Sequence, residues 1–214
     1  MGDIVAGNPA LAAILASTGT ESSDLAFAFI VTVLQIVAIV AAVAGVQIAL
    51  RMYSEETDHR VEPLLATTLR RPTYFASNVV MALSAPALGL VLAGLALGVV
   101  ADAKDDGIAM TDVVLQSVAT IAATWALVAL ALAVVGAMPR IRRLAWLAVV
   151  ATFGLTILGP TFKLPEWALS ISPLHHTPNV TEPGTHWSSV MWLGAITLVL
   201  VVVGFTGFRR RDIL

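Results

Sequence analysis

Residues 75–101 read FASNVVMALSAPALGLVLAGLALGVVA, a stretch without a single ionisable side chain. As a helix rising about 1.5 Å per residue, it is long enough to cross the roughly 30 Å hydrocarbon layer of a membrane. Four more stretches are apolar and free of ionisable residues, and they cover residues 25–50, 113–138, 144–162 and 187–208. Because helices satisfy every backbone polar group of an open chain in lipid, the sequence predicts an all-α, polytopic membrane bundle of five transmembrane helices.

The overall composition agrees with a membrane protein. The chain is 58% hydrophobic and 12% charged, with a mean hydropathy of +0.89, whereas about a quarter of the residues in a soluble domain are charged. It contains no cysteine, which excludes disulfides and thiolate metal sites. It also offers no basic soluble surface of the kind that nucleic-acid binding requires.

The arginines indicate how the helices are oriented. All ten lie in three short clusters, at residues 51–71, 140–143 and 209–211, and the two lysines, Lys104 and Lys163, lie in the alternate connections. Basic residues in short loops mark the cytoplasmic side of a membrane protein. This pattern predicts that the N-terminus lies on the outer side of the membrane and the C-terminus on the cytoplasmic side.

The connections between the spans divide a single transmembrane domain, residues 1–214, into distinct segments. Residues 8–19 resemble a short helix with Asn8 as N-cap and Gly19 just past its end, too short to span the membrane. A turn centred on Gly107 and a tight hairpin over residues 139–143 are also expected. The larger segments are an outer interfacial segment at 1–24, a polar cytoplasmic loop at 51–74 and a proline-rich outer loop at 163–186.

The absence of ionisable residues from the five stretches bears on mechanism. Ion-coupled pumps and proton relays need charged or titratable side chains at membrane depth, so any uphill transport would draw its energy from elsewhere. Gln35, Asn78 and Gln116 are among the polar residues at depth and could line a substrate path. Hydrogen bonding between helices would also explain them.

The cytoplasmic loop contains a pattern typical of a short amphipathic helix. Glu62 and Pro63 suit its first turn, Arg70 and Arg71 suit its last turn, and Pro72 would end it. The apolar residues fall on one face at four-residue spacing: Val61, Leu65 and Leu69. This helix could lie under the lipid headgroups or dock into a groove of a cytoplasmic partner, and its periodicity does not choose between the two.

The same loop resembles that of type-2 permeases of ATP-binding cassette exporters, and most closely the actinobacterial exporters grouped with tetronasin and polyketide-antibiotic resistance. The matching residues are Glu55-Glu56, Arg60, Glu62, Leu64-Leu65-Ala66-Thr67 and Arg71. Further matches follow in the same order at Pro139-Arg140 with Leu144-Ala145-Trp146, at Leu164-Pro165-Glu166-Trp167 with Ile171-Ser172-Pro173, and at Arg209-Arg210-Arg211-Asp212-Ile213.

The chain departs from these permeases in three ways. His59 stands where glycine is usual, and Thr68 where proline is usual. The third departure is the number of spans, because such permeases usually have six per half and begin on the cytoplasmic side, whereas this chain is expected to have five and to begin outside. We therefore expect the chain to resemble the C-terminal part of a longer permease.

The resemblance implies the transmembrane subunit of an ATP-driven exporter of hydrophobic or amphipathic compounds, in a bacterial cell membrane. It implies a separate ATPase subunit, to which ATP binds, and a second permease half or copy. The residues implied in coupling to the ATPase are Glu55, Glu56, Arg60, Glu62, Leu64, Leu65 and Arg71. No G-x-x-x-x-G-K-[ST] phosphate loop is present in the sequence, so we expect neither enzyme activity nor a cofactor in this chain.

Two other interpretations deserve comparison with this one. A non-transporting membrane scaffold could use the loop at residues 51–74 to dock a cytoplasmic partner. An outer metal site could use His175, His176 and His186 with the nearby Glu166 and Glu182. Adjacent histidines point apart on a helix or strand, and H-E-x-x-H spacing is lacking, so a polar loop at the membrane edge is the favoured interpretation of these residues.

Overall fold

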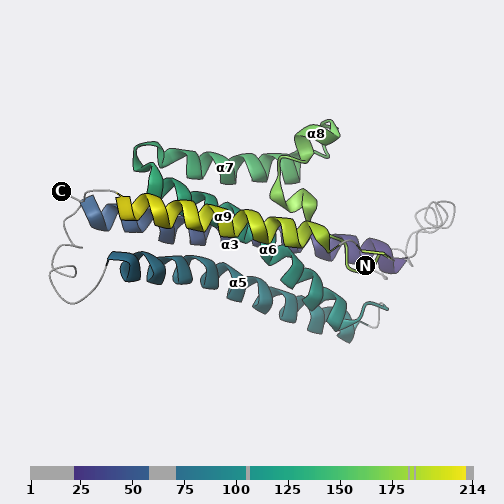
Figure 1. Cartoon of the computed structure of the whole chain (residues 1–214). Coiled ribbons are helices and arrows are strands. Elements are labelled where there is room, and N and C mark those ends of the chain that lie inside the picture. Colours follow the sequence, from purple (N-terminus) through teal and green to yellow (C-terminus); the bar gives the residue numbers. More distant parts are fainter. Residues whose placement is uncertain (1–21, 58–70, 105–106, 183, 186, 211–214) are drawn as a thin grey trace.

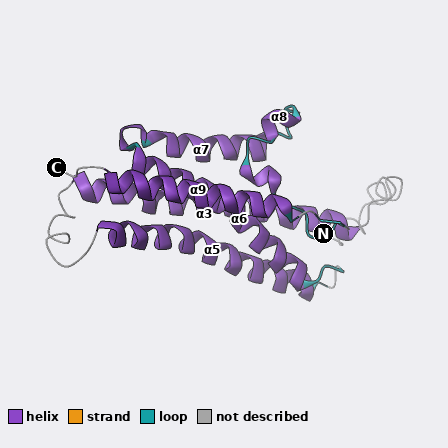
Figure 2. Ribbon diagram, in the orientation of Figure 1, coloured by secondary structure: helices purple, strands orange, loops and turns teal. Residues whose placement is uncertain are grey.

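The computed structural model describes residues 22–57, 71–104, 107–182, 184–185 and 187–210, and this part of the chain consists of helices joined by loops and turns (Figures 1 and 2). The elements, in chain order, are α3 (Ser22–Thr57), α5 (Arg71–Ala103), α6 (Met110–Ala137), η1 (Pro139–Ile141), α7 (Arg143–Phe153), η2 (Gly154–Leu158), α8 (Glu166–Leu169), η3 (Pro173–His176) and α9 (Ser188–Arg210). The predicted short helix at residues 8–19 lies outside the described residues.

Four helices are long and apolar enough to cross a membrane: α3, α5, α6 and α9. They correspond to four of the five predicted spans, but α3 and α5 continue into the predicted cytoplasmic loop, as far as Thr57 and from Arg71. The remaining span, predicted at residues 144–162, is shorter. It is α-helical to Phe153, continues as the π-helical turn η2 to Leu158, and then breaks up into turns.

The hairpin after α6 has the predicted form, and the described part of the connection between α5 and α6 includes Gly107. The hairpin after α6 is the 3₁₀ turn η1, which leads directly into α7. The connection between α5 and α6 places Gly107 at φ 73°, a left-handed conformation that glycine adopts without strain.

Helix α6 occupies the centre of the bundle, with α3, α5 and α9 packed around it (Figure 1). In its most apolar 18-residue window 83% of the residues are buried, against 33% for α3 and less for α5 and α9. Small side chains allow neighbouring backbones to approach closely on all sides of a membrane helix. The small buried residues of α6 include Ser117, Ala119, Thr120, Ala122, Ala123, Thr124, Ala126, Ala129, Ala131, Ala133 and Gly136.

Helices α6 and α9 approach each other closely. A methyl group added to Gly136 would clash with the carbonyl oxygen of Gly204, and one added to Gly204 would lie 2.7 Å from the carbonyl oxygen of Leu132. One turn further on, a methyl group on Gly207 would lie 2.5 Å from Cα of Ala137. The two backbones are therefore in contact along this face.

The glycines of the Gly94-x-x-x-Gly98 pattern in α5 face another helix of the same chain. A Cβ on Gly94 would clash with the Ser117 side chain, and one on Gly98 would lie 2.9 Å from Cγ of Met110. Both of these neighbours belong to α6. The small residues of α5 thus pack against the central helix.

Pro86 lies inside α5, and the helix continues through it. Proline cannot donate to the carbonyl four residues earlier, which belongs to Ala82, and this weakens the hydrogen bonding of that turn. Nearby, the indole N–H of Trp125 donates to the carbonyl of Leu83 at 2.9 Å. The central helix therefore supplies a hydrogen bond to the turn of α5 that proline disturbs.

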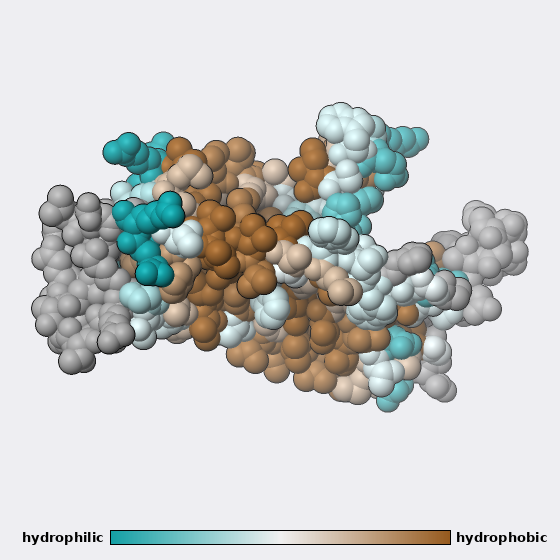
Figure 3. Space-filling view, viewed as in Figure 1, coloured by the Kyte–Doolittle hydropathy of each residue, from teal (hydrophilic) through white to brown (hydrophobic). Residues whose placement is uncertain are grey.

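The surface is an apolar band between two polar ends (Figure 3). Large apolar side chains are exposed along α5, α7 and α9, among them Leu92, Leu147, Val150, Met191 and Leu198. Such an extended apolar surface is not stable in water but is typical of helices that face lipid tails.

We predict that Gly136→Ala destabilises the bundle, because the added methyl group clashes with the backbone of α9. Overpacking of this kind typically costs about 1–3 kcal/mol. Gly194→Ala on α9 is the matched control, since a Cβ there has no heavy atom within 4 Å. Alanine is intrinsically more favourable than glycine in a helix by about 1 kcal/mol, so this control should be neutral or stabilising.

The measurement is the thermal unfolding midpoint of both variants in the same detergent. Equal midpoints for Gly136→Ala and Gly194→Ala would contradict the close contact between α6 and α9.

Candidate functional site

One end of the bundle gathers the described members of all three arginine clusters. The guanidinium of Arg142, in the hairpin, lies 4.5 Å from the ring centroid of Tyr53 near the end of α3. Phe75, near the start of α5, stacks on Phe208 of α9 with centroids 5.1 Å apart. The ends of α3, α5 and α9 and the hairpin therefore meet, as the arginine pattern predicts; that this end faces the cytoplasm remains a prediction.

A hydrogen bond joins the two helices that flank the predicted cytoplasmic loop. The hydroxyl of Tyr74 on α5 donates to Oε2 of Glu55 on α3 at 2.9 Å, and Nε of Arg51 donates to Oε1 of the same carboxylate at 2.8 Å. Tyr74 is buried, in an apolar cluster with Met52, Phe75, Val135 and Phe208. This fixes the distance between the two ends of the loop.

The predicted coupling residues are only partly covered by the structure. Glu55 lies in this junction, Glu56 belongs to the last turn of α3, and Arg71 is the first residue of α5. The other four predicted coupling residues lie outside the described residues: Arg60, Glu62, Leu64 and Leu65. The predicted amphipathic helix also lies outside them, except for its last residue, Arg71. The sequence did not indicate that Tyr74 belongs to this junction. Its hydrogen bond to Glu55 joins residues nineteen positions apart, and such a pair forms no recognisable local motif.

The three polar residues predicted at membrane depth have different surroundings. Gln35 is half-buried on α3. Asn78 is half-buried on α5, where its side-chain amide donates to the carbonyl of Tyr74, one turn earlier, at 3.0 Å. Gln116 on α6 is 1% exposed and is hydrogen-bonded to a different segment of the chain. Their role in a substrate path remains a prediction.

Gln116 fastens the predicted outer loop, residues 163–186, to the central helix. Its Nε2 donates to the carbonyl of Pro178 at 3.0 Å, and its Oε1 accepts the backbone N–H of Val180 at 3.1 Å. One side chain thus satisfies two backbone groups of a loop more than sixty residues away. Buried amides of this kind are usually hydrogen-bonded, and this one positions the loop.

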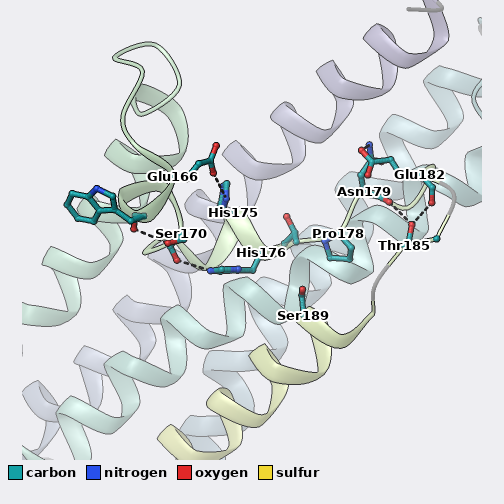
Figure 4. A pocket seen from close by; sticks show the side chains of 12 residues that line it. Glu166, Ser170, His175, His176, Pro178, Asn179, Glu182, Thr185 and Ser189 are labelled. Atoms are coloured by element: carbon teal, nitrogen blue, oxygen red, sulfur yellow. Dashed lines mark hydrogen bonds and ion pairs between the residues drawn. The ribbon is translucent and has the colours of Figure 1, made fainter.

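Next to this attachment the outer loop encloses an open hollow of about 760 Å³ (Figure 4). In the hollow, Nε2 of His176 lies 2.7 Å from the carbonyl oxygen of Ser170, and Nε2 of His175 lies 3.6 Å from a carboxylate oxygen of Glu166. Since a carbonyl only accepts, Nε2 of His176 carries the proton. Among the described residues no group of three or more histidine, aspartate or glutamate side chains lies close enough to hold a metal ion, and His186 is outside them.

Four long apolar helices, an apolar surface band and two polar ends define a multi-pass α-helical membrane protein. Residues 1–209 match the family described as the C-terminal domain of the multidrug efflux system permease Rv1217c, and the chain belongs to this family. It is 31% identical over 215 residues to the multidrug efflux system permease protein Rv1217c of Mycobacterium tuberculosis. The alignment covers 100% of the chain but 39% of that relative.

We predict that Gln116→Leu loosens the outer loop, because it leaves the carbonyl of Pro178 and the N–H of Val180 without their partner. Pro178 and Val180 are half-buried, so we expect the cost to lie near the low end of the roughly 1–3 kcal/mol typical of an unsatisfied buried group. Hydrogen–deuterium exchange should rise at residues 177–182 while the exchange of α6 itself stays slow.

Gln35→Leu is the control, because the side chain of Gln35 makes no hydrogen bond within the described part of the chain. If both variants leave exchange at residues 177–182 unchanged, Gln116 does not hold the loop.

Proposed function

We propose that this chain is the membrane-spanning part of an ATP-driven exporter of hydrophobic or amphipathic compounds. The observation that carries the proposal is the match of residues 1–209 to the C-terminal domain of a multidrug efflux permease. The energy would come from a separate ATPase subunit that holds the ATP and binds the loop at residues 51–74. The charge-free spans support this division of labour, because they offer no carboxylate or basic group for ion coupling.

The junction at the arginine end suggests how coupling would work. Any force on the loop reaches α3 and α5 together, because Tyr74 and Glu55 connect the two helices at its base. Both helices pack against α6, which in turn contacts α9. A displacement of the loop would therefore be passed to the central helix, in the manner of packed helices that shift as rigid bodies.

The finer points of the proposal come from the resemblance described for the sequence. They are a place among the exporters grouped with tetronasin and polyketide-antibiotic resistance, a second permease half or copy, and five spans with the N-terminus outside. In the five-span arrangement α7 and η2 supply the fourth, shortest span. Substrate would travel between the helices or along their lipid-facing surface, and the whole assembly would lie in a bacterial cell membrane.

We predict that Glu62→Gln or Arg71→Gln, in the full-length permease with its ATPase, lowers efflux of a fluorescent hydrophobic dye at least fivefold. Each substitution removes one charge through which the loop would bind the ATPase. The membrane helices and their insertion should stay intact. Arg140→Gln, an exposed arginine in the neighbouring hairpin, is the matched control and should transport normally.

Normal efflux in the Glu62 and Arg71 variants, at equal protein levels, would contradict coupling through this loop. It would favour the alternative of a membrane scaffold, particularly if a protein other than an ATPase copurifies through the loop.

We also predict that Tyr74→Phe lowers efflux several-fold, because it removes the hydrogen bond to Glu55 and keeps the buried ring. The loss of such a bond typically costs about 1 kcal/mol. Arg51→Gln removes the other partner of Glu55 and is the control. This arginine is 76% exposed, and an exposed ion pair contributes less than about 1 kcal/mol.

Dye efflux and ATP hydrolysis should both be measured for these two variants. If Tyr74→Phe transports as well as Arg51→Gln, the link at the base of the loop is not part of coupling.

A further inference from the structure

A recess of about 290 Å³ lies between the last turns of α3 and the start of α7, at the arginine end of the bundle (Figure 1). Small-molecule sites usually measure roughly 300–1,000 Å³, so this recess suits the headgroup of an amphiphile better than the whole molecule. Its lining comes from α3, the hairpin and the first turn of α7: Leu50, Tyr53, Ser54, Arg142, Arg143 and Trp146.

The recess is positively charged. Arg142 and Arg143 both line it, and its described lining includes no aspartate or glutamate. Neither arginine forms an ion pair with a carboxylate in the described part of the chain. Glu55, which follows the recess on α3, already accepts hydrogen bonds from Arg51 and Tyr74. The two guanidinium groups therefore favour an anion, and their planar arrangement of N–H donors matches the oxygens of a phosphate.

An aromatic ring orients one of the two arginines. The guanidinium of Arg142 lies 4.5 Å from the ring centroid of Tyr53, within the roughly 6 Å over which a cation is attracted to an aromatic face. The ring covers one face of the planar guanidinium, whereas its N–H donors lie along the edge. The contact with Tyr53 thus holds Arg142 in position without neutralising its charge.

An exposed apolar surface continues from the recess along α7. Trp146 lines the recess and is 39% exposed. Val150 and Phe153 follow it at spacings of four and three residues, so they share one face of the helix, and both are exposed. Tryptophan is typical of the level at which lipid headgroups meet acyl chains. The basic recess therefore lies where the charged head of a lipid would join its apolar tails.

We propose that this recess binds the headgroup of an anionic phospholipid. The phosphate lies between Arg142 and Arg143, and an acyl chain lies along Trp146, Val150 and Phe153. A zwitterionic lipid carries the same phosphate, but its ammonium group cancels the net charge that attracts basic residues. The bound lipid contacts both α3 and α7 and so fastens the short helix α7 to the bundle. This inference goes beyond the proposed export function and does not depend on it.

The test measures lipid binding to the purified full-length permease in a neutral detergent. Native mass spectrometry compares phosphatidylglycerol with phosphatidylcholine of the same acyl chains, and we expect tighter binding of phosphatidylglycerol. The Arg142→Gln/Arg143→Gln double variant should bind phosphatidylglycerol about fivefold more weakly or worse, because two charges beside the phosphate are lost. Its binding of phosphatidylcholine should change little.

Arg209→Gln/Arg210→Gln is the matched control. It removes the same number of charges from the same end of the bundle, and both arginines are exposed in the last turn of α9, outside the lining of the recess. Phosphatidylglycerol binding should be almost unchanged in this variant. Equal weakening by the two double variants would overturn the proposal, because it would indicate attraction by net charge alone.

A second variant tests whether misfolding explains a loss of binding. Arg142→Lys/Arg143→Lys keeps both charges but loses the planar guanidinium groups. We expect this variant to retain a preference for phosphatidylglycerol, with an affinity between those of the wild type and the glutamine variant. Equal affinities for the two lipids in the lysine variant would overturn the proposal.

Two further measurements separate the lipid from other occupants. Phosphatidylglycerol should raise the thermal unfolding midpoint, whereas inorganic phosphate should raise it no more than chloride does at the same ionic strength. Stabilisation by inorganic phosphate that the glutamine variant loses would assign the recess to a free anion and overturn the lipid. Loss of ATPase copurification in the glutamine variant, with unchanged lipid binding, would assign the recess to the partner protein and also overturn the proposal.

Discussion

The backbone contact between α6 and α9 at Gly136 and Gly204 shows what holds this bundle together. Lipid tails are as apolar as leucine, so membrane helices gain little from hiding apolar side chains and associate through close packing instead. Helix α6 has small residues on every side and is contacted by α3, α5 and α9. The junction at the arginine end and the outer loop attached through Gln116 both depend on helices that α6 aligns.

Much of the helical framework could be predicted from the sequence, but not the position of each helix in it. Charge-free stretches of sufficient length located α3, α5, α6 and α9, because length and hydropathy decide which segments can span a membrane. Hydropathy does not separate a central helix from a peripheral one, since both are apolar all round. The many small residues between positions 113 and 138 are the feature of the sequence that indicates a central helix. The end of the span predicted at 144–162 was misplaced because Gly154, Gly159 and Pro160 interrupt regular α-helix there.

The candidate sites were predictable only where the chemistry is local. Glu55 belongs to an acidic motif that is visible in the sequence, whereas its partner Tyr74 lies nineteen residues away and forms no local pattern with it. Gln116 was recognised as a polar residue at depth, but its partners Pro178 and Val180 follow from the folded loop alone. Polar contacts across such distances depend on the final packing, which a sequence pattern does not encode.

If α7 and η2 form the proposed fourth span, its shortness has a consequence for the surrounding membrane. The 11 residues of α7 and the five of η2 rise about 24 Å at α-helical pitch, several ångströms less than a typical hydrocarbon layer. Lipids beside that segment would have to compress or let headgroups and water dip inward, an adjustment known as negative hydrophobic mismatch. Thr156 of η2, whose hydroxyl is hydrogen-bonded to that of Ser172, is a polar residue within this segment. This side of the bundle would then be the one where a polar group crosses the bilayer over the shortest distance.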